Sequence, residues 1–154
     1  MQTLKKIYQI MVGRSIRAVV IFRISSWCYR NHLKLFGQLF WSLNVILHAI
    51  EISPLAIIGK NFRIAHTVGT VIGAGTVIGN NVIIYQNVTL GSKEDDHGNL
   101  TYPRIGDNVK IFPGSVVIGA IEIGENGIVA PNAVVLKNVP PNNKAMGIPA
   151  KLYK

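Results

Sequence analysis

Branched aliphatic residues recur at every sixth position between residues 58 and 135 of this chain. A period of six is typical neither of an amphipathic helix, which repeats every 3.6 residues, nor of a half-buried strand, which alternates every two. Two interruptions, two extra residues near 68–71 and a nine-residue insertion around 92–103, leave the later phase unchanged. The positions in phase are Ile58, Ile64, Ile72, Ile78, Ile84, Leu90, Ile105, Ile111, Val117, Ile123, Val129 and Val135. Such a repeat predicts a solenoid rather than a globular core.

Each group of six is interpreted as a short strand followed by a corner, and three groups as one triangular coil. The twelve groups then make about four coils. With ~4.8 Å between the strands of neighbouring coils, the coils stack into a prism roughly 19 Å tall. The fourth position after each aliphatic is small or β-branched, as a narrow interior requires: Val68, Thr76, Val82, Val88, Val109, Ser115 and Ala133. The corners carry residues that tolerate positive φ: Gly59, Gly73, Asn80, Asn81, Gly106, Asp107, Asn108, Gly114, Gly124, Asn126, Gly127 and Asn132. A β-sandwich of short strands is the alternative, but a strict sixfold phase has no meaning there.

A helical arm at residues 1–50 precedes the repeats, with helices expected at 3–12, 15–31 and 33–50. The third has one broad apolar face: Leu35, Phe36, Leu39, Phe40, Leu43, Ile46, Leu47 and Ile50. Its opposite face is polar: Lys34, Gln38, Ser42, Asn44 and His48. Its uncharged run of sixteen residues is shorter than the ~20 that a membrane span needs. Two interpretations remain open: the apolar face caps the end of the solenoid, or it lies in a membrane interface.

Charge is unevenly distributed along the chain, whose formal net charge is +9. Seven cations precede the first acidic residue, Glu51: Lys5, Lys6, Arg14, Arg17, Arg23, Arg30 and Lys34. A basic arm suits nucleic acid, an anionic membrane or simple solubility, but no nucleic-acid-binding motif accompanies it. The single cysteine, Cys28, excludes an internal disulfide. Without a recognisable cleavable signal, we expect a cytoplasmic protein, with possible peripheral contact at the inner face of the membrane.

Several motifs in residues 51–151 together are similar to those of one enzyme family: Glu51-Ile52-Ser53-Pro54, Ala65-His66, Val71-Ile72-Gly73, Tyr85-Gln86-Asn87-Val88-Thr89-Leu90-Gly91, Tyr102-Pro103-Arg104-Ile105-Gly106, Val139-Pro140-Pro141 and Gly147-Ile148-Pro149-Ala150-Lys151. They resemble the hexapeptide-repeat acyltransferases, and most closely the serine acetyltransferase branch. This resemblance implies an all-β solenoid, a left-handed parallel β-helix, which is an exception to the right-handed crossover rule. It further implies acetyl-CoA as co-substrate, no metal, and a homotrimer. The domains are then the arm at 1–50, the β-helix at 51–139 with a loop at 92–103, and a capping tail at 140–154.

The resemblance assigns catalysis to His66 and Glu51. His66 matches the family's general base, which removes the proton from the acceptor hydroxyl as it attacks the thioester. Glu51 matches a carboxylate that orients this imidazole, although the family usually has Asp there. A metal site around His97, beside three acidic residues of the loop, is disfavoured because such loops are usually solvated.

The resemblance also places coenzyme A in a groove between adjacent subunits, held mostly by backbone groups. The matching positions are Gly91, Ser92, Pro113, Gly114 and Pro131, and Lys137 and Lys144 are near enough in sequence to meet the coenzyme phosphates. Backbone amides near Gly91 and Ser92 are expected to stabilise the tetrahedral oxyanion.

The acceptor side departs from the serine enzymes. Ala65 stands where they have an Asp, and Tyr102 where they have a second His, so the groups that grip an amino acid are missing. The shortened arm resembles instead the colanic-acid and capsule polysaccharide O-acetyltransferases. We therefore expect a sugar hydroxyl as acceptor, in cell-surface polysaccharide synthesis, contacted by Tyr102, Arg104 and Asn87. The alternatives are serine O-acetyl transfer and, more distantly, a non-catalytic scaffold, which is disfavoured because only His66 and His97 lie in the repeats.

Overall fold

A computed structural model describes residues 13–154. The helix expected at 3–12 lies outside the described residues. Two helices come first, α2 (Arg14–Arg30) and α3 (Lys34–His48), where helices are predicted at 15–31 and 33–50. The strands that follow are β1 (Glu51–Ile52), β2 (Ile57–Ile58), β3 (Arg63–Ile64), β4 (Val71–Ile72), β5 (Val77–Ile78), β6 (Ile83–Ile84), β7 (Thr89–Gly91), β8 (Lys93–Glu94), β9 (Leu100–Thr101), β10 (Arg104–Ile105), β11 (Lys110–Ile111), β12 (Val116–Ile118), β13 (Glu122–Ile123), β14 (Ile128–Val129), β15 (Val134–Val135), β16 (Lys144–Met146) and β17 (Lys151–Tyr153).

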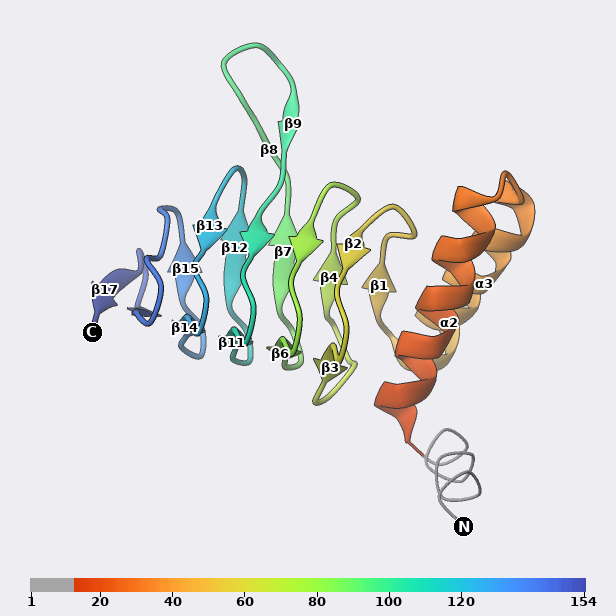
Figure 1. The fold of residues 1–154 in the computed structure, drawn as a ribbon, viewed down its shortest axis with the longest axis horizontal. Coiled ribbons are helices and arrows are strands. Elements are labelled where there is room, and N and C mark those ends of the chain that lie inside the picture. Colours follow the sequence, from red (N-terminus) through yellow and green to blue (C-terminus); the bar gives the residue numbers. More distant parts are fainter. Residues whose placement is uncertain (1–12) are drawn as a thin grey trace.

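The strands form three sheets that make the faces of a prism (Figure 1). We call them the first, second and third sheet, with orders β1-β4-β7-β12-β15, β13-β10-β5-β2 and β17-β16-β14-β11-β6-β3. All pairings within them are parallel except that of β16 with β17. The chain visits the sheets in rotation, so it forms a parallel β-helix, and this helix is left-handed, as the resemblance implies. The stack continues beyond the predicted repeats, because Ile52 pairs with Ile72 at one end and Ala145 with Val129 at the other.

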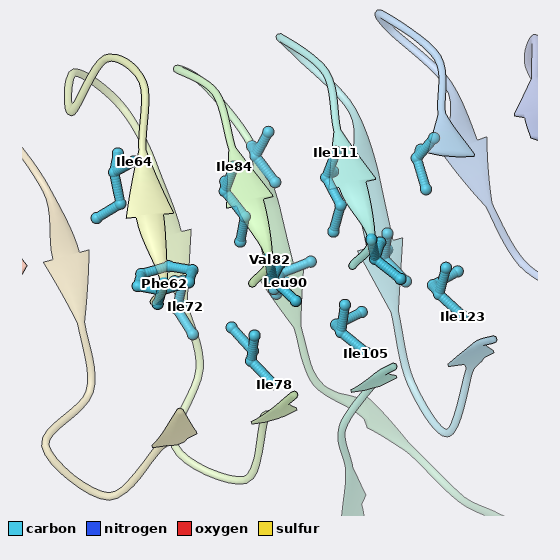
Figure 2. Packing of buried hydrophobic residues seen from close by; sticks show 14 of the residues in the cluster. Phe62, Ile64, Ile72, Ile78, Val82, Ile84, Leu90, Ile105, Ile111 and Ile123 are labelled. Atoms are coloured by element: carbon cyan, nitrogen blue, oxygen red, sulfur yellow. The ribbon is translucent and has the colours of Figure 1, made fainter. Parts of the chain in front are cut away.

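The predicted inward positions form the core. All twelve aliphatics in phase are buried, and Figure 2 shows Ile64, Ile84 and Ile111 on successive coils with their side chains between the sheets. The fourth positions are also buried, with one exception: the prediction is wrong for Val68, which is 56% exposed. Two extra residues lengthen the corner at 65–70, and Thr70 becomes the buried residue there instead.

One edge of the prism carries a ladder of asparagine side chains. Asn61 Nδ2 donates to Asn81 Oδ1 at 3.0 Å, and Asn81 Nδ2 donates to Asn108 Oδ1 at 3.1 Å. Each of the three has a φ between 54° and 59°, which asparagine tolerates better than most residues. Among the predicted corner glycines, Gly114 also has a positive φ, of 70°, but Gly106 has a different reason. A Cβ on Gly106 would lie 2.8 Å from the backbone nitrogen of Glu125, so glycine is required there by the close approach of neighbouring coils.

The helical arm lies across the end of the prism beyond β1 (Figure 1). Ala18 and Phe22 of α2 join the hydrophobic core, and the Arg23 guanidinium donates to the carbonyl oxygens of Ile58, at 2.6 Å, and Gly59. The arm therefore covers the first coil and satisfies carbonyl groups at its edge.

The apolar face of α3 does not cap the β-helix, so this interpretation of that face is wrong. Leu35 and Ile46 are 81% and 78% exposed, whereas Asn44 and His48 on the polar side are buried. The polar side lies against α2, where Asn44 Nδ2 donates to the Ala18 carbonyl at 3.0 Å. Within residues 13–154, no helix combines the length and the apolar character needed to cross a membrane.

Burial of His48 makes the arm sensitive to pH. Neither ring nitrogen has a hydrogen-bond partner among the described residues, and the pKa of His48 is lowered from 6.5, first by desolvation and then by the charges of Arg17 and Arg14. The unfolded chain therefore binds a proton more readily than the folded one, and stability falls as the pH drops below about 6.5. We expect the thermal midpoint to be lower at pH 5 than at pH 8. The shift should be on the order of 3 °C for each kcal/mol by which the free energy of unfolding falls. His48→Leu should weaken this pH dependence, whereas the matched substitution of exposed His32 should leave it unchanged; an unaltered dependence in His48→Leu would contradict the argument.

A β-hairpin, β8 and β9, interrupts the coils and projects from the prism (Figure 1). It occupies the predicted loop 92–103. The Asp95 carboxylate at its turn accepts hydrogen bonds from the backbone nitrogens of Asn99 and His97 at 2.8 and 2.9 Å, and these lower the pKa of Asp95. Among the described residues, no three His, Cys, Asp or Glu side chains lie together as metal ligands would.

Candidate functional site

His66 lies on the long corner between β3 and β4, and its side chain is exposed. The backbone around it is held on both sides. Ala65 N donates to Ile84 O at 2.8 Å, and Gly69 N donates to Ala49 O at 2.9 Å. The imidazole itself has no hydrogen-bond partner among the described residues and is accessible to solvent.

Glu51 reaches the same corner through the backbone. Its nitrogen donates to the Thr70 carbonyl at 2.9 Å, and its strand β1 pairs with β4 directly after the corner. No hydrogen bond or ion pair joins the Glu51 carboxylate to the His66 imidazole in the described chain. The predicted catalytic pair is thus near in the fold without being in contact, and its role stays a prediction.

Two hollows flank this region. One, of about 350 Å³, is a mostly aliphatic groove between α2 and β3 that includes Ser15, Val19, Phe62 and Ala65. The Ser15 hydroxyl donates to the Ala65 carbonyl at 3.3 Å, so the groove ends at the residue before His66. The other, of about 260 Å³, lies between the arm and the first coils and includes Glu51. Both have room for small groups beside the candidate residues.

One edge of the prism collects several predicted site residues. The corners between the third and first sheets carry His66, then Asn87 on the next coil, then Pro113 with Gly114, then Pro131. Successive corners are tied together: Asn87 N donates to Val68 O at 3.0 Å, and Gly114 N donates to Gln86 O at 3.1 Å. We call this line of corners the His66 edge.

The remaining predicted residues do not lie on the His66 edge. Gly91 ends β7 at the opposite margin of the first sheet and Ser92 follows it, and Lys137 follows β15 at that same margin. Arg104 lies in β10 of the second sheet and Lys144 in β16 of the third, both exposed. A single chain therefore does not bring all the predicted residues together.

Tyr102 packs against the corner at Gly73 and Gly75. A Cβ on Gly73 would lie 2.8 Å from Tyr102 Cε1, and one on Gly75 would overlap the same ring. This corner joins the first and second sheets, whereas His66 lies between the third and the first. The packing of this ring on two glycines of its own chain therefore accounts for an aromatic residue at position 102.

Two aromatic residues on the His66 edge were missed by the sequence reasoning. Tyr85 and Phe112 stack with their ring centroids 5.0 Å apart and their planes 12° from parallel. Ala65, Tyr85 and Phe112 each follow an aliphatic in phase, so they occupy the same position on successive coils. The sequence therefore contained a signal for this stacking, because both aromatic residues directly follow an aliphatic of the sixfold repeat. The pair forms a flat apolar surface below Ala65.

Comparisons with known proteins identify close similarities. The pattern of the family "Bacterial transferase hexapeptide (six repeats)" matches residues 102–137. A putative serine acetyltransferase of Schizosaccharomyces pombe is 35% identical over 138 residues, which are 90% of this chain and 51% of that protein. The solved soybean serine acetyltransferase in complex with serine has a TM-score of 0.88 at 35% identity, covering 95% of this chain and 60% of its own. A serine acetyltransferase in complex with CoA has a TM-score of 0.83 at 30% identity, and the match covers 90% of this chain and 56% of that chain.

These findings correct the expected acceptor. The expectation of a sugar hydroxyl in polysaccharide synthesis is wrong, and the resemblance to colanic-acid and capsule enzymes is not supported, because the similar proteins are serine acetyltransferases along nine tenths of the chain. The expectation rested on Ala65 and Tyr102, and the Tyr102 ring packs against Gly73 and Gly75 of its own chain. The chain spans about half the length of the curated relatives it matches.

Proposed function

We propose that this chain, a hexapeptide-repeat transferase, moves the acetyl group of acetyl-CoA to the hydroxyl of serine. The observation that carries the proposal is the similarity to serine acetyltransferases over 90% of the chain at 35% identity. The similarity of the fold to one such enzyme in complex with serine, and to another in complex with CoA, further supports it. Serine O-acetylation was the alternative that the sequence motifs left open.

In this proposal His66 is the general base. Its neutral imidazole takes the proton of the serine hydroxyl while that oxygen attacks the thioester carbonyl, forming the new C–O bond. When the tetrahedral intermediate collapses, the C–S bond breaks and the imidazolium returns the proton to the departing thiolate. Transfer is direct, without an acyl-enzyme intermediate, because the single cysteine, Cys28, is buried in α2 of the arm.

Glu51 is proposed to orient the imidazole. Its backbone nitrogen is bonded to the carbonyl of Thr70, in the same corner as His66. A carboxylate there would hold one imidazole tautomer and stabilise the imidazolium. Tyr85 and Phe112 would supply an apolar wall along the His66 edge for the coenzyme.

We further propose a homotrimer whose site is shared between copies. The His66 edge and the margin with Gly91 and Ser92 lie on opposite sides of the first sheet, so a site that uses both needs two chains. The amides near Gly91 and Ser92 of one copy would then stabilise the oxyanion formed at the His66 of another. The coenzyme would contact Pro113, Gly114, Pro131, Lys137 and Lys144.

Release of free thiol from acetyl-CoA tests this function. With L-serine present, we expect thiol release that saturates with serine, and O-acetylserine detectable by mass spectrometry. L-alanine is the matched control, since it keeps the charged groups of serine and lacks the hydroxyl. Thiol release that is the same with serine, with alanine and without either would refute serine as the acceptor.

A further inference from the structure

The helical arm carries exposed apolar side chains that do not line the groove against β3, and we call them the outer face. It consists of large apolar side chains, mostly from α3, that are at least 36% exposed: Ile24, Trp27, Leu35, Phe36, Leu39, Leu43, Ile46 and Leu47. Soluble monomers rarely expose so many large apolar residues in one place, and such patches are usually covered by a partner or a membrane.

Contacts between the two helices fix this orientation. The buried Ser25 hydroxyl donates to the Gly37 carbonyl at 2.7 Å, and Asn44 Nδ2 donates to the Ala18 carbonyl at 3.0 Å. A Cβ on Gly37 would collide with the Tyr29 ring, so α3 packs closely against α2 through this side. Rotating α3 to bury its leucines would break these contacts and expose Asn44 and His48. The outer face is therefore a stable feature of the arm.

Charge decides between the possible partners. The first fifty residues contain seven lysines and arginines and no acidic residue. Packing one outer face on that of a second copy would bring two such arms together, and like charges oppose this. An anionic bilayer attracts them, at about fivefold in affinity for each cation near its surface. Arg30 and Lys34, at the turn between α2 and α3, are exposed beside Leu35 and Phe36.

The dimensions agree with a helix that lies on a bilayer. At fifteen residues, α3 is about 22 Å long, shorter than the ~30 Å hydrocarbon core. Interfacial helices combine leucine and aromatic residues on one side with basic residues at the margin, and Trp27 and Phe36 lie in the outer face. Because the arm crosses one end of the prism (Figure 1), the coils would extend away from the lipid.

We propose that the outer face of the arm binds the surface of an anionic lipid bilayer. This goes beyond the acetyl transfer proposed above and does not depend on it. The bound helices lie in the interface, with Leu39 and Ile46 among the acyl chains and the cations against the headgroups.

Flotation of the full chain with lipid vesicles tests this proposal. We expect recovery with vesicles of phosphatidylcholine containing 30% phosphatidylserine, little recovery with phosphatidylcholine alone, and weaker binding at 0.5 M salt because screening acts on the electrostatic part. Arg30→Gln/Lys34→Gln should weaken binding roughly 25-fold. Leu39→Gln/Ile46→Gln should weaken it at least tenfold. The matched control is Leu136→Gln, an equally exposed leucine of the β-helix, which should bind like the unaltered chain.

Three results would overturn the proposal. One is the absence of binding to the anionic vesicles, and another is equal binding to neutral and anionic vesicles. The third is a lower mass for Leu39→Gln/Ile46→Gln than for Leu136→Gln in sedimentation equilibrium without lipid, which would assign the outer face to contact between copies. Circular dichroism on each variant confirms that the exposed substitutions leave the fold intact.

Discussion

His66→Ala is expected to lower the turnover number of acetyl transfer by about 100-fold or more, since general-base catalysis contributes on the order of 10²–10⁴-fold. His66 is exposed on a corner whose backbone is held by neighbouring coils, so the substitution removes the base without creating a cavity. Steady-state thiol release from acetyl-CoA with serine measures the effect. Binding of CoA, measured by calorimetry, and the thermal midpoint should stay unchanged.

His97→Ala is the matched control for this experiment. His97 is also exposed, but it lies at the turn of the projecting hairpin, in contact with Asp95 only through its backbone. Its substitution tests whether loss of any surface imidazole affects turnover, and we expect a rate within about twofold of the unaltered chain. Near-normal turnover in His66→Ala would show that another group removes the proton.

Ile84→Ala is expected to have the largest effect on stability, a loss of about 2–5 kcal/mol in the free energy of unfolding. The Ile84 side chain is fully buried and lies between Ile64 and Ile111 of the neighbouring coils (Figure 2). Truncation leaves a cavity that the short strands on either side cannot close by moving inward, because their pairing fixes the spacing between coils. Urea unfolding followed by circular dichroism measures the change.

Ile57→Ala provides the comparison for this prediction. Ile57 lies in β2 directly before a buried residue, but its own side chain points outward and is 54% exposed. Its truncation should change the free energy of unfolding by about 0.5 kcal/mol or less. If the two substitutions had equal effects, burial at the sixfold positions would not be what stabilises the stack.

The core could be predicted from the sequence because one geometric rule governs it. A coil of three equal sides places every sixth residue inside, so Ile84 and Leu90 are identified by position alone, without knowledge of their neighbours. Val68 is the exception that shows the limit of this rule. Its corner has two extra residues, and a count along the chain cannot tell which of them, Val68 or Thr70, turns inward.

The orientation of the arm could not be predicted in the same way. The sequence of α3 shows an apolar side and a polar side, and burying the apolar side is the usual outcome. Here Gly37 permits close approach of the helices and Asn44 bonds to α2, so specific contacts outweigh the general pattern. These contacts join residues of two different helices, which periodicity within one helix does not reveal.

Part of the candidate site was also beyond the sequence. His66 and Glu51 were assigned from the motifs around them, and their catalytic role stays a prediction. The acceptor was mispredicted because Tyr102 was interpreted as a missing functional histidine and as a contact for a sugar, whereas its ring packs against Gly73 of its own chain. The stacking of Tyr85 on Phe112 depends on the register of two coils separated by the hairpin.

The pairing of strands has a consequence for how the chain acquires its structure. Glu51 pairs with Val71, and Val71 with Thr89, so each coil closes on a segment synthesised only about twenty residues earlier. Such short loops close rapidly, and each new coil needs only the previous one as a template. The hairpin lengthens the three closures of one coil, between Val77 and Arg104, Ile83 and Lys110, and Thr89 and Val116. The prism can therefore grow from the arm toward the C-terminus in the order in which a ribosome releases it, with the hairpin-bearing coil as the slowest addition.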